Sequence, residues 1–262
     1  MGFVNTLEEV IRKEKPDYLA VAFDPSGPTF RHEAYPAYKA QREATPEDIK
    51  LSVPVIKQII QAYRIPILEV SGYEADDVIG TVARQAAAAG LDAYMMTPDK
   101  DYAQLVAPHI TMCRPARGGG ALEKLGPEEV KAKYSLESPE QVIDLLGLMG
   151  DTADNIPGCP GVGEKTAVKL IGQFGSIEQL LSRTDELKGA MKRKVEENAE
   201  QIRFSRFLAT IKTDVPITAD FEQMKLTTPD VKQLQEIFEE LEFRTCSTVC
   251  SKTTDLCKSR NR

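Results

Sequence analysis

Apolar residues along the first half of the chain follow two different spacings. Some segments repeat them every three to four residues, as on one face of a helix, and others are short continuous runs typical of buried strands. The helical segments are residues 6–15, 45–63 and 77–89, and the strand-like runs are residues 18–23, 66–70 and 91–96. Because strands separated by helices usually pair in parallel, this alternation predicts an α/β fold with a mostly parallel sheet flanked by helices.

The pattern changes after the glycine triplet at residues 118–120. Strand-like runs nearly vanish, and short helical segments interrupted by Gly and Pro take their place. We therefore predict an α/β domain over residues 1–126 and a helical domain over residues 127–245. The last segment, residues 246–262, is rich in Ser, Thr and Lys and has almost no large apolar side chains, so we expect it to be disordered.

Composition narrows the class of protein. The chain has 262 residues, 42% of them hydrophobic, which is enough for a real core and excludes a disordered protein or a miniature scaffold. No apolar run approaches the ~20 residues that cross a bilayer, and the first residues lack the basic and apolar regions of a signal peptide. The five cysteines have no CxxC spacing, which indicates reduced thiols rather than zinc ligands. We expect a cytoplasmic monomer without membrane association.

Acidic residues follow the predicted strands at the point where each strand ends. Asp24 follows the first strand-like run, residues 74–77 follow the second, and residues 99–101 follow the third. Since the carboxyl ends of parallel strands meet at one edge of a sheet, we expect these side chains to converge. Taken singly, each acid has an ordinary alternative as a helix cap or a solvated loop residue.

Several carboxylates at one edge would repel one another unless cations lay between them. Hard oxygen ligands without His or Cys favour Mg²⁺ or Mn²⁺, and a pair of such ions is a common arrangement for cleaving phosphodiester bonds. Asp151 and Asp154, three residues apart, are spaced to join the same site. The candidate metal ligands are Asp24, Glu74, Asp76, Asp77, Asp99, Asp101, Asp151 and Asp154.

These assignments change the meaning of the net charge. The chain has 33 Lys and Arg against 40 Asp and Glu, a net charge of −7, which taken alone argues against a nucleic-acid partner. Setting the eight candidate ligands aside leaves 33 − 32 = +1. The acidic balance is therefore concentrated in one predicted site, and the remaining surface is near neutral.

The loop over residues 25–45 interleaves aromatic and basic side chains. Aromatic faces stack unpaired bases and cations follow phosphates, so this composition is typical of an element that binds a single strand. The alternative is an ordinary long surface loop, although structureless loops beyond ~15 residues are uncommon without a function. The candidate DNA contacts here are Arg31, Tyr35, Tyr38, Lys39 and Arg42.

A glycine-rich motif occupies residues 150–166. Gly158 and Gly163 have the spacing of a P-loop, but Glu164 stands where the P-loop lysine must follow. We predict instead a helix-hairpin-helix over residues 141–172, whose backbone N–H groups bind DNA phosphates without reading sequence. A glycine-rich connection without a ligand is the alternative. The candidate contacts are Gly158, Gly161, Val162, Gly163, Lys165 and Thr166.

With these motifs identified, the chain resembles the 5′ nuclease or flap endonuclease family, in particular the 5′-3′ exonuclease domain of bacterial DNA polymerase I. The segments that resemble it, in order, are residues 20–42, 72–80, 97–106 and 147–167. The resemblance implies a PIN/resolvase-like nuclease domain followed by a helical domain with a helix-hairpin-helix (helix-3-turn-helix). It also implies two-metal, sequence-independent hydrolysis of DNA at 5′ ends and flaps in replication and repair, with Mg²⁺ or Mn²⁺ as cofactor and K⁺ at the hairpin.

The same resemblance implies individual roles. The eight acids correspond to the metal ligands of the family, and residues 25–45 correspond to the arch that admits the 5′ strand. Lys39 matches a catalytic lysine that reaches the scissile phosphate, and Arg31 is implied as a catalytic residue beside it. Tyr38 and Arg42 are implied as supporting contacts.

Three departures from the family bear on activity. Family members begin with a further strand that carries a metal-binding Asp, and this chain starts after it, so one ligand and the central strand are expected to be missing. Pro98 replaces the usual Gly before Asp99. The polymerase portion that accompanies this domain is absent from the chain as given. We expect low or absent activity, and a non-catalytic DNA-binding module is the alternative function.

Overall fold

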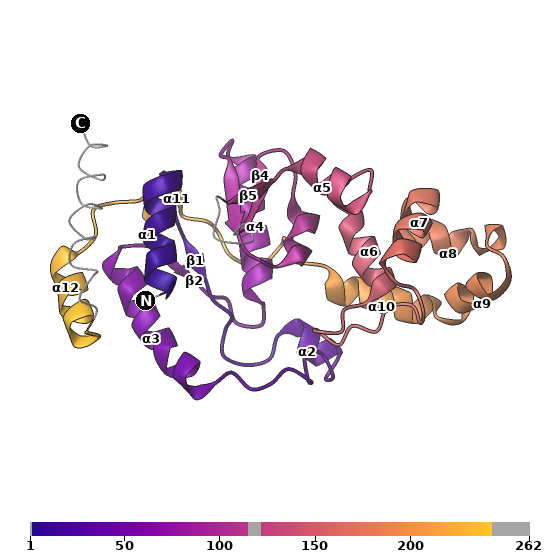
Figure 1. Ribbon diagram of the computed structural model, residues 1–262, viewed down its shortest axis with the longest axis horizontal. Helices are drawn as coiled ribbons and strands as arrows, with labels where there is room; N and C mark the ends of the chain where they lie inside the picture. The colour runs from indigo at the N-terminus through magenta and orange to yellow at the C-terminus, as the bar shows by residue number, and fades with distance from the viewer. Residues whose placement is uncertain (1, 115–121, 243–262) are drawn as a thin grey trace. The chain divides into compact units, whose positions relative to one another are not determined.

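The computed structural model describes residues 2–114 and 122–242 (Figure 1). Their contacts group them into two compact units, each described here by itself. The first unit comprises residues 2–24, 43–69 and 219–242, and the second comprises residues 25–42, 70–114 and 122–218. The predicted boundary at residue 126 stays a prediction, as does the disorder of residues 246–262, which lie outside the described residues together with the glycine triplet.

Helices around a short parallel strand pair make up the first unit. Its helices are α1 (Gly2–Glu14), α3 (Glu47–Ala62), α11 (Phe221–Met224) and α12 (Val231–Glu240). The strands β1 (Val21–Ala22) and β2 (Ile67–Leu68) pair in parallel. Apolar side chains from α1, α3 and α12 form its core, including Val4, Leu7, Ile59, Ile60, Leu234 and Phe238.

One acid, Glu8, is buried in this core. Its side chain is 7% exposed, and its Oε1 accepts a hydrogen bond from the hydroxyl of Tyr63 at 2.5 Å. Burial raises the pKa of Glu8 above its ordinary value of 4.5, although the hydrogen bond from Tyr63 acts in the opposite direction. A carboxyl with a raised pKa in the folded state stabilises the fold below its ordinary pKa, and this contribution is lost as pH rises.

We therefore expect Glu8→Gln to become more stable relative to the parent protein as pH rises above 4.5. Glutamine keeps the oxygen that accepts from Tyr63 but cannot ionise. The measurement is urea unfolding of both proteins at about pH 4 and about pH 8, on either side of the ordinary Glu range. Glu9→Gln is the control, because Glu9 is exposed and pairs with Lys13. If the free energy of unfolding of Glu8→Gln falls relative to that of the parent protein as pH rises, the expectation is contradicted.

A three-stranded sheet and its helices begin the second unit. The strands are β3 (Ala93–Met96), β4 (Ile110–Arg114) and β5 (Glu123–Leu125), in that order across the sheet. β3 pairs with β4 in parallel, and β4 pairs with β5 in antiparallel orientation. Three further elements belong to this half of the unit: α2 (Phe30–Ala34), α4 (Ala75–Ala88) and the 3₁₀ helix η1 (Lys100–Leu105). α4 and η1 both contact this sheet.

The rest of the second unit is helical (Figure 1). Its elements are α5 (Pro127–Tyr134), α6 (Gln141–Met149), α7 (Glu164–Phe174), α8 (Ile177–Ser182), the 3₁₀ helix η2 (Thr184–Glu186), α9 (Gly189–Glu197) and α10 (Ala199–Ala209). α6 and α10 pack closely because Gly147 has no side chain. A Cβ there would lie 2.8 Å from Cδ1 of Ile177 and 2.9 Å from Cβ of Arg206.

The structure confirms the predicted class of fold, with three differences. The helices over residues 6–15, 45–63 and 77–89 are present within a few residues of their predicted ends. The described strands form two sheets rather than one, and the β4–β5 pair is antiparallel. β4 itself was not expected, because its sequence ITMCR mixes polar and apolar residues. Among the described residues, no helix is both long and apolar enough to cross a membrane.

Candidate active site

The acids of residues 74–77 lie at the start of α4. Glu74 has the extended backbone of an N-cap residue, and Asp76 and Asp77 occupy the first turn, where negative charge complements the helix dipole. Asp77 is fully buried and its Oδ2 accepts from the N–H of Glu74 at 3.0 Å, as in a capping box. The helix start therefore fixes the backbone that presents these three carboxylates.

Arg31, from α2, pairs with two of these acids. Its Nη1 donates to Oε2 of Glu74 at 2.9 Å and to Oδ2 of Asp77 at 2.8 Å, and its Nη2 donates to Oδ1 of Asp77 at 2.8 Å. The side chain is almost completely buried. Burial works to lower the pKa of Arg31, but the bonds and charges of Asp77 and Glu74 outweigh it and raise the pKa. The guanidinium is therefore a permanent buried charge.

Two predicted roles are at odds with this geometry. Asp77 also accepts from the N–H of Lys212 at 2.7 Å, so each of its oxygens receives two hydrogen bonds and no lone pair remains for a metal ion. Arg31 is 2% exposed, so it cannot contact DNA in this arrangement. Sequence spacing placed both residues near the site but could not show which way their side chains point.

The segment that ends the predicted arch docks onto the loop that carries Asp154. The N–H of Lys39 donates to the carbonyl of Asp154 at 3.1 Å, and Asn155 Nδ2 donates to the carbonyl of Ala37 at 2.7 Å. Lys39 Nζ pairs with Oε1 of Glu74 at 2.5 Å, and Arg42 pairs with Asp154. The two basic side chains expected to hold phosphate thus lie directly among the acids.

Asp76, Asp99 and Asp101 make no ion pair with a basic side chain of the described residues, although the charges of Lys39 and Lys100 act on Asp76 and Asp101. Asp76 accepts from the hydroxyl of Tyr102 at 2.7 Å. Burial raises the pKa of Asp76 to about 6 against the lowering effect of Tyr102, and the charge of Asp99 adds to the rise. Burial and Asp99 likewise raise the pKa of Asp101 to about 7. These two carboxyls are held at a cost in free energy that a bound cation would relieve.

Lys100 and Asp151 form the remaining ion pair of the cluster, with 2.9 Å between Nζ and Oδ2. Burial works to raise the pKa of Asp151, but the bond to Lys100 outweighs it and the pKa lies below its usual range. Within the second unit the cluster has seven acids and four basic partners, so its charge when fully ionised is 4 − 7 = −3. The acids are Glu74, Asp76, Asp77, Asp99, Asp101, Asp151 and Asp154.

A divalent cation fits the chemistry of this cluster. In the described part of the chain no three His, Cys, Asp or Glu side chains converge closely enough to hold one ion as they stand. Asp101 nevertheless has a buried oxygen, Oδ1, without a hydrogen-bond partner, and its neighbour Asp99 is exposed. Hard oxygen donors, excess negative charge and an unpartnered buried oxygen are the features that Mg²⁺ or Mn²⁺ would satisfy.

The aromatic side chains of the predicted arch are used inside the fold. Tyr38 is 3% exposed, and its hydroxyl donates to Glu74 at 3.0 Å and to Asp154 at 3.3 Å. Tyr35 is half-buried and packs edge-on against Phe204, with ring centroids 5.6 Å apart. The ring of Tyr38 is therefore buried and its hydroxyl bonded within the fold, and its role as a DNA contact stays a prediction.

The glycine-rich loop connects α6 to α7 and only part of it is accessible. Gly158 is buried, its N–H donates to Oγ of Ser205 at 2.9 Å, and its carbonyl accepts from Gln201. Val162 is 4% exposed and its N–H donates to the carbonyl of Cys159. These two predicted DNA contacts are thus used internally. The exposed candidates are Gly161, Gly163 and Lys165, with Thr166 half-buried at the start of α7.

Asp24 is the one candidate ligand outside the second unit. It follows β1 in the first unit, and its place in the cluster stays a prediction. Two residues that contact the acids were missed, Lys100 and Tyr102. Both lie in the segment that was singled out, where the compact 3₁₀ turn of η1 directs them toward Asp151 and Asp76. Lys100 lies between the candidate ligands Asp99 and Asp101, and Tyr102 directly follows Asp101, so their place in the sequence could have identified both.

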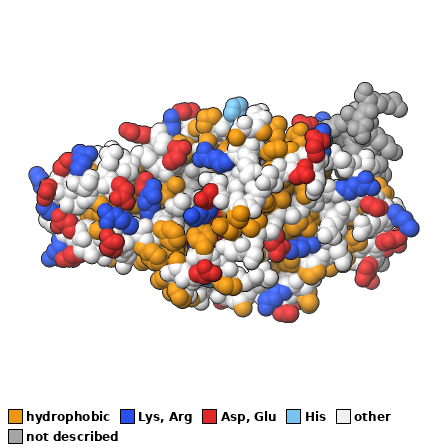
Figure 2. Space-filling view, turned by 180° about the vertical axis from the view of Figure 1, so that it is seen from behind, with side chains coloured by type: hydrophobic (Ala, Val, Ile, Leu, Met, Phe, Trp, Pro, Cys, Tyr) orange, Lys and Arg blue, Asp and Glu red, His pale blue; other side chains and the backbone are white. Residues whose placement is uncertain are grey.

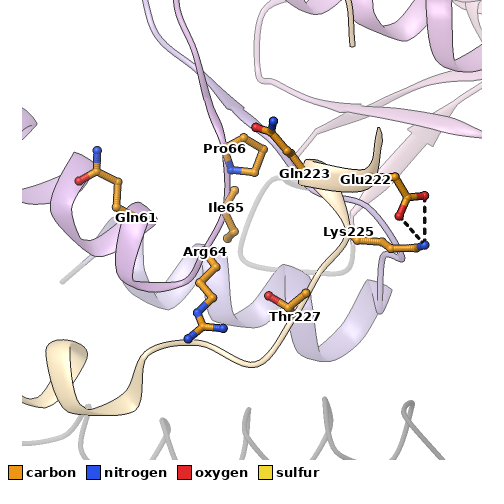
Figure 3. A pocket seen from close by; sticks show the side chains of 8 residues that line it. All are labelled: Gln61, Arg64, Ile65, Pro66, Glu222, Gln223, Lys225 and Thr227. Atoms are coloured by element: carbon orange, nitrogen blue, oxygen red, sulfur yellow. Dashed lines mark hydrogen bonds and ion pairs between the residues drawn. The ribbon is translucent and has the colours of Figure 1, made fainter. Parts of the chain in front are cut away.

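Figure 2 shows Lys and Arg side chains interspersed with Asp and Glu over the face that it draws. A pocket in the first unit is lined by residues of α3, of α11 and of the segments that follow them, and its one ion pair joins Glu222 and Lys225 (Figure 3). No candidate site residue lines this pocket, so it adds nothing to the acid cluster.

Comparison with known proteins identifies the family. Residues 1–135 match the model of the 5′-3′ exonuclease N-terminal resolvase-like domain, and residues 137–232 match that of the 5′-3′ exonuclease C-terminal SAM fold. The chain is 41% identical to DNA polymerase I of Bacillus caldotenax over 93% of its length, and it spans 28% of that protein. It therefore covers little more than a quarter of the length of such curated relatives.

Solved structures agree on the fold. The T5 5′-exonuclease with bound divalent zinc ions superposes with a TM-score of 0.66 at 18% identity, covering 98% of this chain and 90% of that one. The catalytic core of Rad2 in complex with DNA substrate gives 0.61 at 15% identity, covering 91% and 77%. Both family models together span most of the chain, which belongs to the 5′-3′ exonuclease family.

Proposed function

We propose that this chain hydrolyses DNA phosphodiester bonds at 5′ ends and flaps, with Mg²⁺ or Mn²⁺, without reading sequence. The observation that supports it most is the acid cluster of the second unit, which retains a charge of −3 after its four basic partners are counted. Bound cations would relieve the repulsion within such a cluster, and membership of a 5′-3′ exonuclease family makes DNA the natural substrate.

Each part of the site has a distinct task in this proposal. Asp76, Asp99 and Asp101 would hold the metal, and Tyr102 keeps the carboxylate of Asp76 in place. Bound metal would supply an activated water and stabilise the charge that develops on the phosphate. Lys39 and Arg42 would exchange their present carboxylate partners for phosphate oxygens of the DNA.

The exposed part of the hairpin would hold the duplex. Gly161, Gly163 and Lys165 are exposed beside the first turn of α7, where backbone N–H groups attract a phosphate. A K⁺ ion at this hairpin belongs to the same proposal. We also propose that the chain acts as a monomer in the cytoplasm.

A cleavage assay on a 5′-flap substrate tests the function. We expect a product, at low yield, that forms with Mg²⁺ or Mn²⁺ and is abolished by a chelator. Asp76→Asn combined with Asp99→Asn should abolish it while leaving DNA binding intact. Asp185→Asn is the matched control, because Asp185 is an exposed acid outside the cluster, paired with Lys192.

A non-catalytic DNA-binding module is the second candidate. It is favoured by the ion pairs of Lys39, Arg42 and Lys100, which occupy carboxylates of the cluster. Binding of the flap substrate without any metal-dependent product would establish it and reject hydrolysis. A product that survives the Asp76→Asn/Asp99→Asn substitution would reject the proposed site instead.

A further inference from the structure

We propose that Arg31 is a positioning residue, which holds the carboxylates at the start of α4 in register with the segment after α10, and that it does not contact DNA. The proposal rests on the proposed function, because it concerns the same acids. It assigns Arg31 a task different from that of Lys39 and Arg42, although all three lie in the predicted arch.

The hydrogen bonds of Arg31 use every donor that the side chain has. Besides the three bonds to Glu74 and Asp77, Nε donates to the carbonyl of Leu208 at 2.9 Å, and Nη2 donates to the carbonyl of Thr210 at 2.7 Å. A guanidinium has five N–H donors, and all five are occupied. No donor remains for a phosphate.

The partners of Arg31 come from distant parts of the chain. The side chain starts in α2, its acids lie at the start of α4, and its two carbonyls lie at the end of α10. Asp77 reinforces the connection, since it accepts from the N–H of Lys212 at 2.7 Å. Arg31 and its two acids therefore join three segments of the chain, and the partners of Arg31 lie 43 to 179 residues from it in the sequence.

The five hydrogen bonds of Arg31, called the clamp from here on, also set the orientation of the neighbouring carboxylates. Arg31 and the hydroxyl of Tyr38 both donate to Oε2 of Glu74, which leaves Oε1 to Lys39. Asp76 shares the first turn of α4 with Asp77, so the position of that turn also determines where the Asp76 carboxylate lies. A catalytic site needs such groups within about 0.5 Å, and a displacement of about 1 Å can cost ~100-fold in rate.

Lysine cannot replace this side chain without loss. It keeps the charge but has three donors on one nitrogen, so it cannot make the paired bonds to Asp77 and also reach the carbonyls of Leu208 and Thr210. We expect Arg31→Lys to lower kcat by ~100-fold and to weaken Mn²⁺ binding, while KM for the flap substrate stays within about twofold.

The salt dependence of DNA binding separates positioning from contact. Removing one phosphate contact reduces the slope of log K against log salt by about 1. Arg31→Lys and Arg31→Gln should leave the slope unchanged, whereas Lys165→Gln, the positive control from the exposed hairpin, should reduce it. An unchanged kcat, or a reduced slope for Arg31→Gln, would overturn the proposal.

Labelling of the unaltered protein tests the same point without any substitution. An arginine reagent such as phenylglyoxal should modify exposed Arg193 and leave Arg31 untouched, with or without DNA. Modification of Arg31 in the free protein and its protection by DNA would show a contact and reject the clamp. If the parent protein cleaves no DNA, the proposed function fails, but this labelling still decides whether Arg31 is buried as the clamp requires.

Discussion

Gly158→Ala is expected to destabilise the second unit by about 2 to 5 kcal/mol. The backbone of Gly158 has a φ of +62°, which costs an L-residue ~1 to 2 kcal/mol. A Cβ there would also lie 2.5 Å from the carbonyl carbon of Met149 and 2.7 Å from its oxygen, and close to the N–H of Gly150. Crowding of this kind costs a further ~1 to 3 kcal/mol, because backbone atoms cannot move aside as a side chain can.

Urea unfolding measures this loss, with Gly163→Ala as the matched control. Gly163 lies in the same loop, but its φ is −99°, and apart from its chain neighbours no atom of the described residues lies within 4 Å of the added Cβ. We expect this control to stay within about 0.5 kcal/mol of the parent protein. Equal unfolding midpoints for the two variants would show that the close approach of residues 149–150 to Gly158 is wrong.

The same substitution should impair the acid cluster. The backbones of Asp151 and Ile156 hydrogen-bond to each other, at 2.9 and 2.8 Å, and this small bridge lies between Gly150 and Gly158. Spreading those glycines apart would shift Asp151 and Asp154, which contact Lys100 and Arg42. Metal-dependent cleavage by Gly158→Ala should therefore fall even in conditions where the variant remains folded.

The sequence predicted the elements that carry the acids better than the partners of those acids. Helices over residues 45–63 and 77–89 follow from local spacing and capping, which depend on neighbouring residues only. The carboxylates at 74–77 and 99–101, which follow predicted strands, and those at 151–154, which precede the predicted hairpin, contact basic or polar partners in the second unit.

The local sequence pattern could not predict the direction in which each side chain points. Arg31 and Tyr38 have the composition of DNA contacts, yet both are buried because Asp77, Glu74 and carbonyls near Thr210 satisfy them. Gly158 has the sequence setting of an exposed turn, but α10 covers it through Ser205. These partners lie far away in sequence, so only the folded chain identifies them.

Asp77→Asn should be far more damaging to stability than Asp76→Asn, although the two acids are adjacent. Removing the charge of Asp77 leaves the buried guanidinium of Arg31 with only Glu74 as a charged partner, and breaking a buried pair in this way costs ~3 to 5 kcal/mol. The new amide group would also face N–H donors of Arg31, Glu74 or Lys212, since every oxygen lone pair of Asp77 accepts a bond.

Asp76 has the opposite electrostatic setting. Burial raises its pKa to about 6 in spite of the bond from Tyr102, and Asp99 adds to the rise. Asparagine keeps the oxygen that accepts from Tyr102 and removes the repulsion, so in metal-free buffer Asp76→Asn should unfold within about 1 kcal/mol of the parent protein.

Urea unfolding in the presence of a chelator, combined with Mn²⁺ titration of each folded protein, distinguishes the two roles. We expect Asp76→Asn to keep its stability and lose Mn²⁺ binding, and Asp77→Asn to lose stability first. If Asp77→Asn instead folds as well as the parent protein and only loses the metal, then Asp77 is a ligand after all, and the pairing of Arg31 with it is not what holds the start of α4. Comparison of these two variants therefore distinguishes the role expected for Asp76, which is to bind metal, from the role expected for Asp77, which is to stabilise the fold.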